Sequence, residues 1–170
     1  MFNFPLIINC FLNNKVRIFI VVRNLVNSFQ LSNSLKITFP DSEYPLLLRT
    51  DFSNDTAWET IKKKVTSPDN EYEAVVTFID DRRFENLALE QLPSFDTEQD
   101  KHDFVFIADS LSMHGQENTI LCVDLAEDYG KHFRVIPSRL WSVANNLFIT
   151  NMEFNEFAES VDLNGVFRGF

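Results

Sequence analysis

Five short apolar runs, separated by segments of helical or turn character, constrain the fold of this 170-residue chain most strongly. The runs are residues 45–50, 74–80, 103–109, 119–125 and 132–137. Apolar runs of this length, rich in Val, Ile and Phe, are typical of buried strands. Because the apolar faces of a sheet must be covered by other elements, the pattern predicts a sheet with helices packed on it.

Two connecting segments have helical periodicity. In residues 51–65, Trp58, Ile61 and Val65 share one helical face. Residues 84–92 carry a shorter amphipathic pattern, which predicts a second helix between the second and third strands. Helices that connect successive strands are typical of α/β folds.

A hairpin and a helical pair complete the predicted domain. Gly130 lies in the short "AEDYGK" connection between the fourth and fifth runs, where it suits a hairpin turn. Two helical patterns follow, and we expect the closing "GVFRGF" to fold back on the domain. The sequence therefore predicts a single α/β domain, with a mixed sheet of about five strands, helices packed on it and a C-terminal helical pair.

The block "FRVIPSRLWSVANNLFITNMEFNEFA" combines a tryptophan, two adjacent asparagines and several phenylalanines. Trp141 continues the apolar stripe of the next helix, so we predict that it is largely buried against Phe154 or Phe157. Asn145 and Asn146 fall where the first helix is expected to end, and Asn tolerates the left-handed conformation of a turn. We interpret the block as architectural, with a binding role as the alternative.

The charge of the chain is unevenly distributed. Residues 1–40 contain four basic residues and no acidic ones, whereas residues 41–170 hold all 25 acidic residues and have a net charge of −14. We interpret residues 1–40 as an N-terminal extension, either disordered or upstream of the true start, and residues 41–170 as the single α/β domain. The extension lacks the run of about 20 apolar residues that a membrane span needs, so we expect no membrane association.

The acidic domain limits the classes of partner. Strong negative charge repels phosphate backbones, so we expect no nucleic-acid binding, whereas a protein with a basic surface is a suitable partner. Cys10 and Cys122 lie far apart and have no CxxC neighbour, which favours reduced core thiols and a cytoplasmic location.

Aspartates follow the predicted strands. Asp51, Asp80 and Asp109 each come after an apolar run, and parallel strands would bring them to one edge of the sheet. Clustered carboxylates there suit Mg²⁺, which prefers oxygen ligands. The structural alternative, which we favour, is that each aspartate caps the helix or turn that follows its strand.

Three arginines are candidate contacts for an anion or a partner: Arg49, Arg134 and Arg168. Arg49 and Arg134 alternate with buried neighbours in predicted strands, so the favoured interpretation is internal pairing with carboxylates such as Asp51 or Asp124.

Several stretches resemble one family. "LLLRTDFSNDTAW", "FIADS", "ILCVDL", the C-terminal block quoted above and "NGVFRGF" are similar to an uncharacterised bacterial domain family that is known only as a domain of unknown function. The resemblance covers residues 44–170. It implies a compact cytosolic domain that usually stands alone, and it implies no activity, cofactor or catalytic residue.

These observations favour a non-enzymatic protein-binding domain, immunity-like or regulatory. The absence of a catalytic motif, the acidic charge and the aromatic C-terminal helices motivate this hypothesis. The alternative is a Mg²⁺-dependent hydrolase or nucleotide-binding enzyme that uses the aspartates at the strand ends, with Arg49 steadying a phosphate.

Overall fold

The computed structural model describes residues 38–66, 72–92 and 102–170. Contacts divide the chain into two units, Met1–Lys36 and Ile37–Phe170, and the described residues belong to the second. The predicted extension, residues 1–40, therefore lies almost entirely outside the described residues, as does Cys10.

Six strands form one mixed sheet in the order β2-β1-β3-β4-β5-β6. The strands are β1 (Leu46–Arg49), β2 (Thr77–Ile79), β3 (Phe104–Ala108), β4 (Ile120–Asp124), β5 (His132–Val135) and β6 (Val166–Phe167). The first three are mutually parallel, β4 runs antiparallel to both β3 and β5, and β6 pairs in parallel with β5. The α/β fold class and the mixed sheet with packed helices are confirmed, with one strand more than expected.

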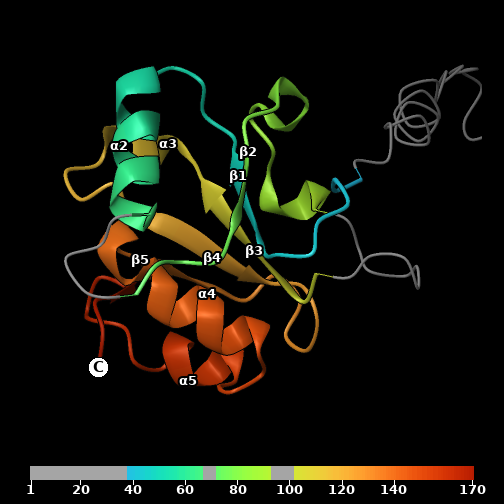
Figure 1. The fold of residues 1–170 in the computed structure, drawn as a ribbon, viewed down its shortest axis with the longest axis vertical. Coiled ribbons are helices and arrows are strands. Elements are labelled where there is room, and N and C mark those ends of the chain that lie inside the picture. The colour runs from blue at the N-terminus through green and yellow to red at the C-terminus, as the bar shows by residue number, and fades with distance from the viewer. Residues whose placement is uncertain (1–37, 67–71, 93–101) are drawn as a thin grey trace, which may run out of the picture. The chain divides into compact units, whose positions relative to one another are not determined.

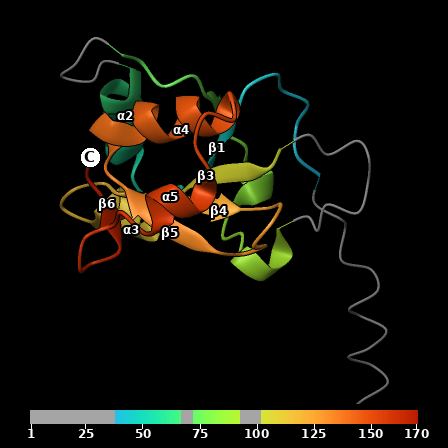
Figure 2. The same ribbon diagram turned by 90° about the horizontal axis from the view of Figure 1, so that it is seen from below.

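Among the described residues, four α-helices accompany the sheet: α2 (Asp55–Thr66), α3 (Ser110–His114), α4 (Leu140–Phe148) and α5 (Phe154–Ala158). Three 3₁₀ turns complete the described elements: η2 (Arg82–Phe84), η3 (Leu89–Gln91) and η4 (Pro137–Arg139). Figure 1 shows α2 and α4 beside the sheet, with the segment that carries η2 and η3 apart from them. Figure 2 places α2 and α4 together over one side of the sheet.

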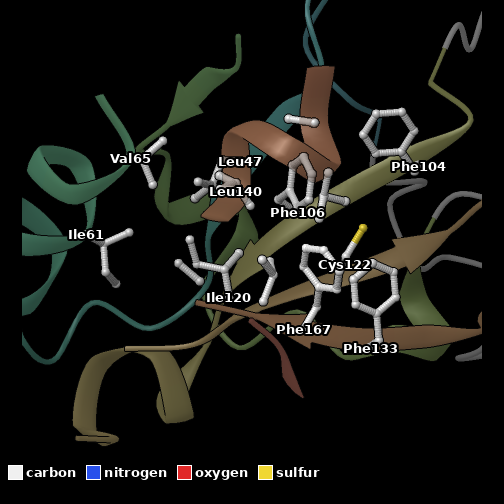
Figure 3. Packing of buried hydrophobic residues seen from close by; sticks show 14 of the residues in the cluster. Leu47, Ile61, Val65, Phe104, Phe106, Ile120, Cys122, Phe133, Leu140 and Phe167 are labelled. Atoms are coloured by element: carbon white, nitrogen blue, oxygen red, sulfur yellow. The ribbon is translucent and has the colours of Figure 1, made fainter. Parts of the chain in front are cut away.

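The helix-covered face holds the larger core. Strand register aligns Leu47, Phe106, Cys122 and Phe133 in one row across four strands. Figure 3 shows this row packed with residues of α2 and α4, and all of its members are buried. Burial in this apolar layer raises the pKa of the Cys122 thiol, as expected for an inert core cysteine.

The opposite face of the sheet carries a second apolar cluster under the segment with η2 and η3. Leu48, Ile107, Leu121 and Arg134 form the row on this face, because each follows or precedes a residue of the helix-covered row. Phe84 is fully buried against this cluster. No α-helix of the described chain contributes buried residues to this second cluster.

The C-terminal tail folds back as predicted. Phe167 is fully buried in β6 and contacts Phe157, and Phe170 packs on both rings. Gly130 has a φ of 85° in the turn between β4 and β5, as the hairpin prediction requires.

Three predictions about local structure were wrong. Residues 84–92 form 3₁₀ turns instead of a helix, because Asn86 has a φ of 58° and its N–H donates to the Thr50 carbonyl. Trp141 is only partly buried, and it stacks on Tyr72 with ring centroids 4.8 Å apart instead of packing on the α5 phenylalanines.

The paired asparagines do not form the turn that was predicted for them. Asn145 and Asn146 both lie within α4, and the left-handed residue after the helix is Thr150, with a φ of 53°. The helix therefore extends further than the sequence pattern suggested, and the side chains of both asparagines are available for other contacts.

Candidate functional site

The three aspartates of the predicted metal site follow β1, β2 and β3 at the edge where these parallel strands end. Within the described ranges, no group of three or more His, Cys, Asp or Glu side chains could hold a metal ion. The structure thus places Asp51, Asp80 and Asp109 at one edge but does not assemble them as a metal-ligand set. Each engages different partners.

Arg49 organises the part of this edge beside β1 and β2. Its side chain is 4% exposed and pairs with Asp55 at 2.6 Å and with Asp80 at 3.4 Å. The guanidinium also lies 4.6 Å from the ring centroid of Phe52, and Trp58 donates its indole N–H to Asp80. A buried arginine with these partners satisfies its charge within the chain.

Asp51 lies beside a serine and a histidine. Its carboxylate accepts the Ser53 N–H at 2.7 Å and lies 3.5 Å from His114 Nε2, which is 2.8 Å from Ser53 Oγ. Burial opposes ionisation of Asp51, but the Ser53 hydrogen bonds and the charges of His114 and Arg49 outweigh it and lower the pKa. Serine and aspartate approach the same ring nitrogen, so this cluster is not a nucleophile relay, which needs them on opposite nitrogens.

Asp109 caps α3 and pairs with Arg134. Its carboxylate accepts a hydrogen bond from the Ser112 N–H at 3.1 Å. It also accepts hydrogen bonds from both terminal nitrogens of Arg134. Arg134 also donates to the Thr119 carbonyl at 3.0 Å. The expected internal pairing of Arg134 is present, but Asp109 is the partner. The suggested partner Asp124 instead accepts backbone N–H groups of the loop after β4.

Arg168 fastens the C-terminal tail. It pairs with Glu117 at 2.5 Å and with Asp162 at 2.7 Å. Hydrogen bonds from Arg168 lower the pKa of both carboxylates. All three candidate arginines therefore have carboxylate partners within the chain, which the favoured interpretation expected of Arg49 and Arg134.

An acidic groove lies at the C-terminal end of α4. Its cavity of about 400 Å³ is bordered by residues 41–45, residues 102–104 and the end of α4. Three carboxylates line it, those of Asp41, Glu43 and Asp103. Of its lining residues, only His102 has a basic side chain, so the groove carries a negative potential.

Four exposed apolar side chains and the partly buried Trp141 lie at this groove and beside α4. We call the set Tyr44, Tyr72, Val75, Trp141 and Phe148 the α4 surface. Tyr44 and Phe148 form an edge-to-face pair at 5.9 Å and are 46% and 42% exposed. Trp141 and Phe148 are seven residues apart and so share one helical face.

Asn145 holds the segment before β2 against α4. Its side-chain oxygen accepts the Val75 N–H, and its amide donates to the Glu73 carbonyl, both at 2.9 Å. The side chain thereby acts as a short strand partner for an extended segment. These two bonds fix Tyr72 and Val75 beside the helix, so the α4 surface is ordered by contacts within the domain.

This surface could not be predicted from the sequence. Tyr44 and Phe148 are more than one hundred positions apart, and neither belongs to a recognisable motif. The paired asparagines were the one local signal, and their hydrogen bonds across the fold could not be read from helical periodicity.

Comparison with known protein families gives a match. The model of a family described as "Domain of unknown function (DUF6924)" matches residues 44–170. No curated protein and no solved structure matches the chain. In the part of the chain that the structure describes, no helix is both long enough and apolar enough to cross a bilayer.

Proposed function

We propose that this chain, which belongs to the DUF6924 family, is a non-enzymatic domain that binds a partner protein through the α4 surface and the acidic groove. The partner presents basic and apolar side chains, and the interaction is immunity-like or regulatory. The observation that carries the proposal is the exposed ring pair of Tyr44 and Phe148, which lies beside three carboxylates at the end of α4.

Exposed aromatic side chains in a row are suited to protein recognition. Aromatic residues are enriched at the centres of protein interfaces, where they bury much area and lose little side-chain entropy. Tyr72 is 57% exposed and Phe148 is 42% exposed, so both retain surface for a partner to cover. The hydrogen bonds of Asn145 fix the segment of Tyr72, which reduces the ordering cost of binding.

The carboxylates of the groove favour a partner with positive charge. Asp41, Glu43 and Asp103 flank Tyr44 and Phe148, so an apolar anchor that enters the groove brings its neighbouring side chains close to negative charge. Lysine or arginine at those positions would gain attraction and a faster association rate. The net charge of −10 for the whole chain acts in the same direction.

The enzyme alternative has less support from the geometry. Asp80 is engaged by Arg49 and Trp58, and Asp109 by Arg134 and Ser112, so metal binding would have to displace these partners. Thermal denaturation with Mg²⁺, Mn²⁺ and nucleotides tests it. Stabilisation that is lost in Asp51→Asn and Asp109→Asn would favour the enzyme over the binding domain.

Affinity capture from native lysate tests the proposal, with five baits compared at several salt concentrations. Wild type is compared with Glu43→Lys, which reverses a groove charge, and with Glu127→Lys, which reverses an exposed charge outside the groove. A second pair compares Phe148→Ala with Leu163→Ala, since both remove an exposed apolar side chain and only the former belongs to the α4 surface.

We expect one stoichiometric protein to be retained by wild type, Glu127→Lys and Leu163→Ala, and lost with Glu43→Lys and Phe148→Ala. The purified partner should then bind wild type with an association rate that falls as salt is added. Retention of the same partner by both groove variants, or the absence of any stoichiometric protein at every salt concentration, would reject the proposal.

A further inference from the structure

A second cavity lies on the face of the sheet opposite the α-helices. Its volume is about 550 Å³, within the range of small-molecule sites. Ile107 and Leu121 are register partners on β3 and β4 and supply apolar lining from the sheet. Leu87 and Leu89, from the segment between and within the two 3₁₀ turns, line the cavity from the other side.

Arg134 is the register partner of Leu121 in the same row, and its guanidinium group lines one side of this cavity. Its two terminal nitrogens donate to Asp109 and to Thr119. Its Nε–H has no acceptor in the described chain, so the side of the guanidinium formed by Nε and Nη2 retains donor capacity. Paired guanidinium donors match the two oxygens of a carboxylate.

His132 adds a second polar group on the same side. It lies two residues before Arg134 in β5, so both side chains belong to one face of the sheet, and both line the cavity. His132 Nδ1 lies 2.9 Å from the Gly130 carbonyl, which can only accept, so Nδ1 carries the hydrogen. The other ring nitrogen, Nε2, is left for a ligand and donates when the ring is protonated.

We propose that this cavity binds a small organic monocarboxylate with an apolar body. The body would cover Ile107 and Leu121, and the carboxylate would accept from the unused donors of Arg134. Asp109 already balances the charge of Arg134, and its carboxylate repels a dianion such as a phosphate monoester more strongly than a monocarboxylate. This site is separate from the α4 surface, which lies on the helix-covered side of the sheet.

Titration of the full chain with octanoate, followed by amide NMR shifts, tests the proposal. Octanol carries a similar apolar body without the charge, and acetate carries the charge without the body. Ala88→Trp and Asn164→Trp each place a large side chain at an exposed rim position of the cavity. Ala126→Trp is the matched control, because Ala126 is exposed and does not line the cavity.

We expect octanoate to shift the amides of residues 87–89, Ile107, Leu121 and Arg134, with affinity at least about fivefold higher than that of octanol or acetate. Both rim variants should abolish these shifts, and Ala126→Trp should retain them. Equal affinity for octanoate and octanol, persistence of the shifts in both rim variants, or no shift at all would overturn the proposal. None of these outcomes depends on the α4 surface.

Discussion

The two faces of the sheet are built from the same strands but are covered differently. On one face, the row Leu47, Phe106, Cys122 and Phe133 is packed under α-helices that contribute Trp58, Ile61, Leu140, Val143 and Phe157. On the other, the row that ends in Arg134 is covered by a segment with only two 3₁₀ turns, and a cavity of about 550 Å³ remains. Long helices present continuous apolar stripes, whereas short turns present single side chains such as Phe84.

This difference separates stability from binding capacity. Removing a methylene group from a close-packed face lowers the free energy of unfolding. A face that already borders a cavity has fewer contacts to lose and retains space for a ligand. We therefore expect the helix-covered face to dominate the free energy of unfolding and the opposite face to tolerate change.

The largest predicted effect compares one substitution on the two faces. Leu47→Ala, on the helix-covered face, should lower the free energy of unfolding by about 3–5 kcal/mol, because its fully buried site cannot collapse. Leu121→Ala, beside the cavity, should cost about 2 kcal/mol. Chemical denaturation measures both values, provided that the dependence of the unfolding free energy on denaturant is unchanged. Equal losses would show that the two faces are packed equally well.

The next prediction compares the same substitution at the two tryptophans, one fully buried and one partly buried. Trp58 is 1% exposed and donates to Asp80, so Trp58→Phe leaves a gap and removes a donor, at a cost of about 2–3 kcal/mol. The Trp141 indole nitrogen has no partner in the described chain although it is shielded from solvent. Trp141→Phe removes that unsatisfied donor and keeps an aromatic ring on Tyr72, so we expect a change within about 1 kcal/mol. Thermal denaturation of both variants checks the order.

The strands could be predicted from the sequence because each buried strand is a short apolar run of consecutive residues. Each of the five predicted runs contains a strand, and the first three are parallel, which the sequence left open. β6 was missed because two residues are too few for a periodic signal. The helix over 84–92 was predicted wrongly because the hydrogen bond from Asn86 to Thr50 is a long-range contact.

The site was predicted in its residue types but not in its pairings. The sequence indicated that Arg49 and Arg134 bind carboxylates, yet it suggested Asp51 and Asp124 as the partners. The observed partners are Asp55 and Asp80 for Arg49 and Asp109 for Arg134. Asp80 and Asp109 follow other strands, so the fold of the sheet brings them within reach, whereas Asp55 lies only six residues after Arg49. The α4 surface could not be predicted for the same reason, because its side chains meet across the fold.

Substitution of Asn145 tests how much the hydrogen bonds between α4 and the segment before β2 contribute to stability. Asn145→Ala removes two hydrogen bonds to that segment, and we expect a loss of about 1 kcal/mol, since Val75 is partly exposed and water can replace one partner. Faster amide hydrogen exchange at Val75 should accompany the loss. Asn146→Ala is the matched control, because its amide donates within α4 to the Ser142 carbonyl. An equal change of exchange at Val75 in both variants would contradict the role assigned to Asn145.

The smallest predicted effect concerns the rim of the cavity on the less covered face. Hydrogen bonds from Arg168 lower the pKa of Asp162 and of Glu117, and Asp162 also accepts the N–H groups of Asn164 and Val166 that shape this rim. A carboxylate whose pKa is lowered by folding stabilises the native state above its unfolded pKa, and this contribution disappears as the pH falls through the folded value. The unfolding free energy of wild type should therefore decrease between about pH 5 and pH 3, and Arg168→Met should show a weaker decrease over the same window. Arg82→Met is the control, since Arg82 pairs on the surface with Glu85 and neither residue lines the cavity. If Arg168→Met retains the full pH dependence of wild type, the tail is held by the burial of Phe167 alone, and the ion pairs at its end contribute nothing measurable.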